Sequence, residues 1–245
     1  MNHSDYPQIR QAGENALLIY LAPVANPQVL AQVQWLSQQL RLQLGSLLQE
    51  IIPSYNTVLL VYDFLRLDQS QLELCLADLL AQLKEPALSS SQSVSSSQSA
   101  ERSSGKLIEL PCYYSVETGP DLAAVAAQHQ LSVSELIKIH SEQQYQVYAI
   151  GFAPGFAYLG WIDARIATAR LTTPRLKVPA GSVAIADRQT AVYPATSPGG
   201  WNLLGNCPIP LFDLQKEPAM KLRTGDAVRF VPIERAEYLR LGGQL

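Results

Sequence analysis

The chain has 245 residues, of which 47% are hydrophobic and 16% are charged, and its formal net charge is −3. This length suffices for one large or two small domains, and the composition is that of a soluble globular protein. The weak negative charge argues against a nucleic-acid-binding surface, which is normally basic. We expect no membrane span, because no apolar run approaches the ~20 residues that one requires. No signal peptide is visible at the N-terminus.

The first predicted domain, residues 1–88, alternates strand-like and helix-like patterns. A helix is expected to start at Asn26 and Pro27, because asparagine caps helices and proline is tolerated in the first turn. A second helix is expected to start after Asp68. Both helices carry apolar residues at helical spacing on one face: Val29, Leu30, Val33, Leu36 and Leu40 in the first, and Leu72, Leu76, Leu79 and Leu83 in the second.

Strands of this domain are expected at three short apolar runs, residues 15–21, 47–52 and 57–62. Residues 53–56 (PSYN) are expected to form the turn between the last two strands. The resulting order β-α-β-β-α predicts an α+β sandwich, with the helices on one face of an antiparallel sheet.

Residues 89–104 interrupt these patterns: ten of the sixteen residues are serine and none is aromatic. A segment of this composition buries too little apolar surface to offset the entropy that it would lose on ordering. We interpret it as a flexible linker that separates residues 1–88 from residues 105–245.

The second predicted domain, residues 105–245, is mostly β. Ser132 and Glu135 form a capping box, which predicts the start of a short helix that ends near His140. Strands are expected at apolar runs punctuated by glycine and proline: residues 106–114, 147–150, 182–186, 191–193 and 227–232. Short strands, many turns and no further long helix predict a closed or nearly closed β-barrel.

Three segments of this domain are dense in glycine and proline: residues 150–160 (IGFAPGFAYLG), 173–183 (TPRLKVPAGSV) and 189–202 (QTAVYPATSPGGWN). Glycine permits positive φ and a close approach of the backbone to a ligand, and proline fixes φ. Interleaved aromatic residues are able to wall a small pocket. The alternative interpretation is a set of tight barrel corners with the aromatic residues in the core.

These segments, together with TGDAVRFVPI at residues 224–233, resemble the family of the 5-oxoprolinase B subunit. The resemblance is strong over residues 145–233. The family also includes KipI-type inhibitors of sensor histidine kinases and proteins called allophanate hydrolase subunit 1. The resemblance implies an α+β protein in which a small N-terminal α+β sandwich domain precedes a cyclophilin-like β-barrel domain.

The same resemblance implies partners and a co-substrate. It implies a complex with the 5-oxoprolinase C subunit, which has a related barrel, and with the A subunit. This complex uses ATP to open the lactam 5-oxo-L-proline to L-glutamate. The chain contains no phosphate-binding loop of the G-x-x-x-x-G-K-[ST] type. We therefore expect ATP to bind in, or together with, a partner subunit.

Three polar residues are the expected catalytic candidates. His140 matches a histidine of the family pattern and suits acid–base work or anion binding, unless it only stabilises a helix C-terminus. Arg175 suits the carboxylate of 5-oxoproline or a phosphoryl oxygen, unless it forms a surface ion pair. Gln189, next to Thr190, is able to donate to and accept from a lactam, with packing at a barrel corner as the rival interpretation.

The other expected contacts lie in the glycine- and proline-rich segments. Ser182 has no GxSxG context and no nearby base, so we expect no serine nucleophile, although its N–H suits an oxyanion. The expected substrate-binding residues are Phe152, Pro154, Gly155, Phe156, Tyr158, Gly181, Ser182, Thr190, Tyr193, Ser197, Gly199, Gly200 and Trp201.

The chain departs from the family pattern at several positions. Asp187, Arg188 and Ala191 stand where relatives have glycine, Ala169-Arg170 stands where they have Pro-Arg, and Asn206 and Cys207 stand where they have Arg and Thr. Fewer glycines restrict the backbone, and the missing arginine removes a possible phosphate ligand. These departures bear on the ligand contacts and not on the fold.

The three cysteines, Cys75, Cys112 and Cys207, are far apart and have no zinc-site spacing. We therefore expect reduced thiols, a cytoplasmic protein and no metal ligands. Two functions stay open: a subunit of an ATP-using lactam hydrolase, or an inhibitor that binds a sensor histidine kinase through an exposed apolar patch. A urea-derived substrate such as allophanate is a third interpretation.

Overall fold

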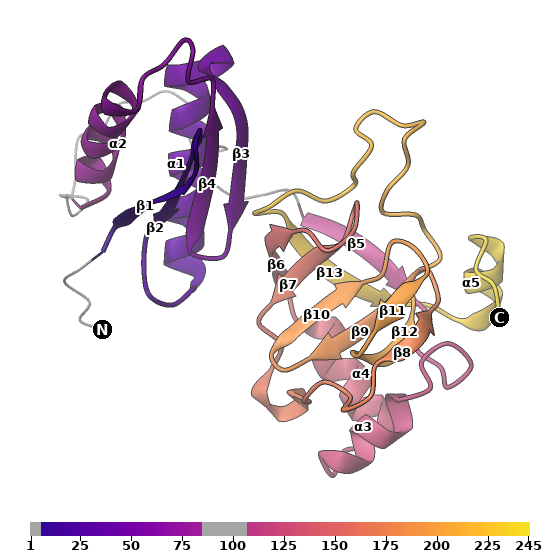
Figure 1. Ribbon diagram of the computed structural model, residues 1–245. Coiled ribbons are helices and arrows are strands. Elements are labelled where there is room, and N and C mark those ends of the chain that lie inside the picture. The colour runs from indigo at the N-terminus through magenta and orange to yellow at the C-terminus, as the bar shows by residue number, and fades with distance from the viewer. Residues whose placement is uncertain (1–5, 85–106) are drawn as a thin grey trace, which may run out of the picture. The chain divides into compact units, whose positions relative to one another are not determined.

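The structure is a computed structural model that describes residues 6–84 and 107–245, and these residues form two compact units (Figure 1). The predicted linker, residues 89–104, lies outside the described residues, and the predicted domain boundaries stay predictions. The elements of the first unit are β1 (Gln8–Gly13), β2 (Ala16–Tyr20), α1 (Pro27–Leu44), β3 (Leu48–Ser54), β4 (Thr57–Tyr62) and α2 (Gln69–Lys84).

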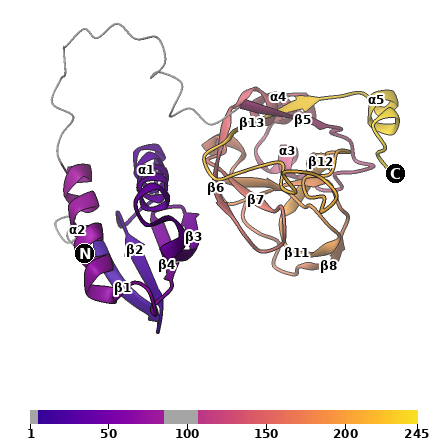
Figure 2. The ribbon, with the colours of Figure 1, turned by 90° about the horizontal axis from the view of Figure 1, so that it is seen from above.

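The four strands of the first unit form an antiparallel sheet in the order β1-β2-β4-β3. Both helices lie on the same side of this sheet (Figure 2). The core there joins alternate strand residues, such as Leu17 and Ile19, to Val33 of α1 and Leu76 of α2. Strand β1 was not predicted, because its sequence QIRQAG is polar and mostly exposed.

The local signals for the two N-terminal helices are confirmed. The Asn26 side chain accepts a hydrogen bond from the Val29 backbone N–H at 2.9 Å, and Asp68 accepts one from Gln71 at 2.9 Å. The turn between β3 and β4 is shorter than predicted, because Pro53 and Ser54 belong to β3.

The second unit contains more strands than the sequence predicted. Its elements are β5 (Leu107–Cys112), α3 (Leu122–Gln128), α4 (Val133–Glu142), β6 (Tyr145–Ile150), β7 (Ala157–Gly160), β8 (Arg175–Val178), β9 (Ser182–Ala186), β10 (Gln189–Val192), β11 (Ser197–Gly199), β12 (Asn202–Asn206), β13 (Ala227–Pro232) and α5 (Arg235–Arg240). The capping box is confirmed, because Ser132 N–H donates to Glu135 and Glu135 N–H donates to Ser132. The helix that it starts ends at Glu142 rather than near His140.

Seven strands of this unit pair in the order β5-β13-β6-β7-β10-β9-β12. The pair β5 and β13 is parallel and the other pairs are antiparallel. Tyr113, which follows β5, forms an isolated bridge to Asn206 at the end of β12, with N–H···O distances of 2.9 and 3.0 Å. Strands β8 and β11 form a separate two-stranded sheet. The α+β class is confirmed, whereas the cyclophilin-like barrel stays a prediction, because a single bridge joins the two ends of the path.

Strands β9 and β10 separate two packed layers. Val183, Ile185 and Val192 belong to the main core, which also contains residues of α3 and α4. Ala184, Ala186 and Ala191 belong to a second cluster on the opposite face, together with aromatic side chains. Because side chains alternate along a strand, Thr190 lies on the core face of β10 and Gln189 lies on the aromatic face.

Candidate functional site

A cleft with a volume of about 770 Å³ lies beside β8, and we call it the β8 cleft. It is lined by β8, by the turn before β9, and by the segments that follow β10 and β12. The charged side chains in its lining are Glu117, Arg175 and Lys177. An apolar wall is formed by Val192, Tyr193, Pro194, Pro208, Ile209, Pro210 and Leu211, and Tyr238 and residues 242–245 complete the lining.

Three of the residues expected from the sequence meet in this cleft: Arg175, Gly181 and Tyr193. Gly181 has a φ of +78°, and a Cβ there would lie 2.4 Å from the backbone oxygen of Cys207, so the turn requires glycine. Gly181 N–H donates to the backbone oxygen of Tyr193 at 2.7 Å, and this bond fixes the backbone of Tyr193 next to the turn. The sequence therefore brings two of its three glycine- and proline-rich segments to one cleft.

Arg175 is engaged by a partly buried ion pair. Its Nη2 lies 2.6 Å from Oδ1 of Asp121, and the two side chains are 27% and 16% exposed. The other carboxylate oxygen of Asp121 accepts a hydrogen bond from Leu203 N–H at 2.7 Å. Arg175 also donates to the backbone oxygen of Trp201 at 3.3 Å. Arg175 thus ties β8 to the start of α3 and to β12, with its charge already compensated.

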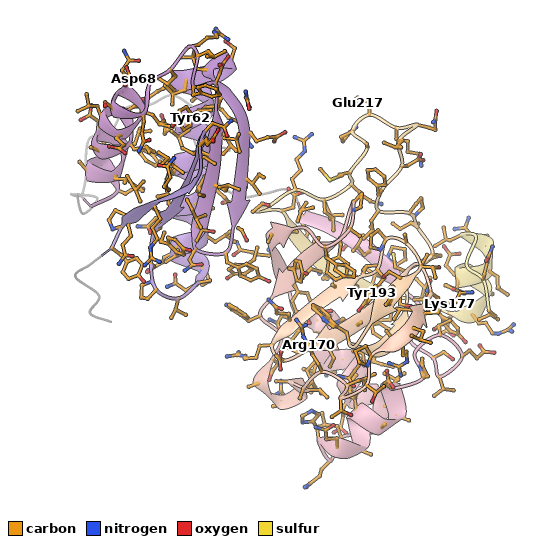
Figure 3. All side chains as sticks on the ribbon, viewed as in Figure 1. Tyr62, Asp68, Arg170, Lys177, Tyr193 and Glu217 are labelled. Carbon is orange, nitrogen blue, oxygen red and sulfur yellow. The ribbon has the colours of Figure 1, made fainter. Side chains whose placement is uncertain are left out.

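The predicted aromatic residues form one cluster on the outer face of β9 and β10. Phe156 contacts four of its members edge to face, with ring centroids 4.9–5.9 Å apart: Tyr158, Phe152, Tyr193 and Trp201. Arg170 lies over the Trp201 ring at 5.7 Å. Burial raises the pKa of Tyr193. Tyr193, which is labelled in Figure 3, is the member of this cluster that lines the β8 cleft.

His140 and Thr190 meet on the opposite face of the sheet, inside the core. Both side chains are 0% exposed, and Nε2 of His140 lies 2.9 Å from Oγ1 of Thr190. Thr190 donates its hydroxyl proton to the Ala184 oxygen at 3.0 Å, so Nε2 of His140 carries a proton. Nδ1 then accepts from Tyr114 Oη at 2.7 Å.

Burial lowers the pKa of His140 to about 3, so the imidazole is neutral. A fully enclosed side chain does not touch a substrate in the β8 cleft. The structure therefore does not bring His140 and Thr190 together with Arg175, and the contact between these two side chains joins α4 to β10.

The remaining predicted residues are dispersed around the cluster. Gln189 is half-buried on the aromatic face of β10 and does not line the β8 cleft. Ser182 N–H already donates to Pro179 at 3.3 Å, so it is not available to an oxyanion. Gly155 and Gly199 allow close packing, because a Cβ at Gly199 would lie 2.3 Å from Tyr193 Oη. Pro154 is exposed, and Ser197 and Gly200 are half-buried.

Sequence reasoning missed four residues of this site. Lys177 and Arg175 lie two residues apart on β8, so strand alternation is the signal that could have identified Lys177. Asp121, Asn206 and Tyr238 gave no such signal, because their partners are distant in sequence. Asn206 Nδ2 donates to Ala180 at 2.8 Å, and Tyr238 Oη lies 3.1 Å from Asn206 Oδ1.

Two departures from the family pattern thus have a structural role. Asn206 holds the turn before β9 through Ala180, and Cys207 N–H donates to the Gly181 oxygen at 2.7 Å. Among residues 6–84 and 107–245, no group of three or more His, Cys, Asp or Glu side chains is placed to hold a metal ion. No helix within the same ranges is long and apolar enough to cross a membrane.

Residues 7–222 match the family model described as carboxyltransferase domain, subdomain C and D. The 5-oxoprolinase B subunit of Bacillus subtilis (strain 168) is 37% identical over 94% of this chain and 95% of its own length. The protein of the same name from Haemophilus influenzae is 38% identical over 89% and 94%. That from Escherichia coli O157:H7 is 48% identical over 52% of this chain and 58% of its own.

The chain is also similar to solved structures. The protein TTHA0988 is 31% identical with a TM-score of 0.73, and the match covers 93% of this chain and 40% of that one. The conserved uncharacterized protein PH0987 from Pyrococcus horikoshii is 40% identical over 94% and 100%, with a TM-score of 0.54. The urea carboxylase of Kluyveromyces lactis shares the fold at 16% identity and a TM-score of 0.68, over 22% of its chain. The chain therefore belongs to the family of the 5-oxoprolinase B subunit.

Proposed function

We propose that this chain is one subunit of an ATP-dependent 5-oxoprolinase, that it works with the A and C subunits, and that its β8 cleft binds 5-oxo-L-proline. The observation that carries the proposal is the meeting of two family-like segments in one cleft, through Arg175, Gly181 and Tyr193. Relatives named as the B subunit of 5-oxoprolinase align over most of the chain, which supports the same function.

The chemistry accounts for the need for ATP. A lactam is a stable amide, and water attacks its carbonyl carbon slowly. Transfer of the γ-phosphoryl group of ATP to the lactam oxygen releases ADP and turns that oxygen into part of a good leaving group. Water then adds to the activated carbon, and the ring C–N bond breaks to release the amine and leave an acyl phosphate. A second water hydrolyses this acyl phosphate, which releases phosphate and yields the second carboxylate of L-glutamate.

In this proposal the chain binds and orients the lactam, and a partner supplies most of the nucleotide site. The Arg175–Asp121 pair fixes β8 against Leu203, and Tyr193 and residues 208–211 offer an apolar surface to the lactam ring. Direct contacts by Gln189 and by the other predicted residues that lie outside the cleft stay predictions. ATP is a co-substrate of the complex, in keeping with the lack of a phosphate-binding loop in the sequence.

Reconstitution tests this function. The chain is combined with the A and C subunits, and the release of ADP and glutamate is measured with and without 5-oxo-L-proline. We expect 5-oxoproline-dependent release of both products only when all three proteins are present. Equal rates in the absence of this chain would refute the proposal.

A second candidate is a urea-derived substrate such as allophanate, which the fold shared with the urea carboxylase of Kluyveromyces lactis supports. The reconstituted complex distinguishes the two when 5-oxo-L-proline, urea and allophanate are supplied in parallel.

Inhibition of a sensor histidine kinase stays a prediction. Affinity capture that retrieves a kinase and no C subunit would support it.

A further inference from the structure

The charged side chains that line the β8 cleft do not balance. Glu117 accepts hydrogen bonds from Tyr113 Oη at 2.8 Å and from Arg235 at 3.2 Å, and these bonds lower its pKa. Arg175 is paired with Asp121. The side chain of Lys177 forms no hydrogen bond or ion pair with any residue that the structure describes. Among the charged side chains of the cleft lining, the Lys177 ammonium group is therefore the one without a partner of opposite charge among the described residues.

The backbone that carries Lys177 is firmly placed. Strand β8 pairs with β11 through Val178 and Arg175, which lie on either side of this position. Val178 is fully buried in the aromatic cluster, whereas the Lys177 side chain is exposed along the cleft. Figure 3 shows Lys177 on the same part of the unit as Tyr193. A flexible ammonium group thus projects from a fixed strand next to an apolar wall.

A second hollow of similar volume, at the end of α4, lacks this imbalance, and we call it the α4 hollow. It is lined by three acidic and three basic side chains: Glu135, Glu142, Asp163, Lys138, Arg165 and Arg188. Lys138 lies 3.9 Å from Glu142, Arg165 lies 2.8 Å from Asp163, and Glu135 is held by Ser132. The α4 hollow carries equal numbers of acidic and basic side chains, and its Arg188 donates to the backbone oxygen of Ile162 at 3.4 Å. We therefore expect the α4 hollow to attract an anion less than the β8 cleft does.

We propose that Lys177 binds the carboxylate of the substrate in the β8 cleft, with the substrate ring against Tyr193 and residues 208–211. The ligand class is a small monoanionic carboxylic acid with a compact ring, because the cleft supplies one free cation and an apolar wall. A lysine is a point charge with three donors, which suits a single carboxylate. The proposal rests on the proposed function and names the residue that selects the substrate there.

The test uses the complete three-protein complex and measures kcat and KM for 5-oxo-L-proline. In Lys177→Gln we expect KM to rise about 10-fold to 100-fold, since a hydrogen bond to a charged group is lost, with a smaller change in kcat. Lys177→Arg should restore part of the affinity, because it keeps the charge. Lys216→Gln is the control, since Lys216 pairs with Asp213 outside the cleft and its loss should leave KM unchanged.

A lactam without a carboxylate, 2-pyrrolidinone, adds a readout that a merely structural role would not produce. Its inhibition constant should be the same for the wild-type complex and for Lys177→Gln. A parallel rise of this constant and of KM would overturn the proposal, as would a KM within twofold of wild type. Absence of 5-oxoproline turnover by the wild-type complex would instead refute the proposed function, so the two failures are distinguishable.

Discussion

The imidazole of His140 is enclosed by Tyr114, Tyr145, Thr190 and Phe230, with the Phe230 ring stacked at 4.7 Å. Its pKa in the folded chain is about 3, against about 6.5 when it is exposed. Below pH 6.5 the His140 imidazole therefore binds a proton in the unfolded chain but stays unprotonated in the folded chain. This group's contribution to stability is complete above pH 6.5 and is lost as the pH falls towards 3.

Replacement of His140 tests this linkage. In His140→Gln we expect the unfolding free energy at pH 7.5 to fall by about 2 kcal/mol, because Thr190 and Tyr114 lose a well-placed partner. We also expect a shallower loss of stability between pH 6 and pH 4, since this histidine contributes a slope of about 1.4 kcal/mol per pH unit. Urea titrations across this range measure both effects. Identical slopes for the variant and the wild type would contradict the burial of a neutral imidazole.

The ion pair between Arg175 and Asp121 supports a second prediction. Asp121→Asn removes the charge that compensates a partly buried guanidinium, so we expect a loss of about 1–3 kcal/mol in unfolding free energy. Glu237→Gln removes an exposed partner of Arg240 and serves as the control, with no measurable loss. Equal stability of both variants in urea titrations would show that the Asp121 pair contributes nothing.

The sequence predicted the place of some site residues and not that of others. Arg175, Gly181 and Tyr193 stand in motifs, and the structure brings them to one cleft. The burial of His140 depends on Thr190, fifty residues further along the chain, and no local pattern reveals that contact. Lys177 was within a quoted motif, but its lack of a compensating charge is a property of the assembled cleft.

At the scale of elements, the turn before β9 controls the shape of the cleft. A methyl group at Gly181 would meet Cys207 O at 2.4 Å and Asn206 Oδ1 at 2.6 Å, and its φ of +78° strains other residues. We expect Gly181→Ala to cost at least about 2 kcal/mol in unfolding free energy and to weaken substrate binding. Gly151→Ala is the matched control, since nothing lies within 4 Å of a Cβ there. Thermal unfolding that ranks the two variants equally would contradict this account.

Elements with strong local signals were predicted well, whereas the polar strand β1 and the short strands β7, β8, β11 and β12 were missed. The bounds of β4, β9 and β13 agree with the predicted strands. Strands β8 and β11 are only four and three residues long and pair with each other outside the main sheet, so their sequences carry little apolar alternation. Their pairing nevertheless positions both cations of the cleft.

At the scale of the whole molecule, the sequence predicted the α+β class and the resemblance predicted the family. It did not predict which of the three glycine- and proline-rich segments share a cleft. That outcome follows from β9 and β10, whose alternation places Thr190 on the core face and the aromatic cluster on the other. Which segments meet at the cleft depends on the packing on both faces of the sheet, and the sequence of a single segment does not predict that packing.

The measurement that tests the central claim most directly is a crystal structure of the three-protein complex with 5-oxo-L-proline bound. We predict the lactam in the β8 cleft, with its carboxylate within hydrogen-bonding distance of Lys177 and its ring against Tyr193. A lactam bound in the α4 hollow, or held by a partner protein far from β8, would contradict the account.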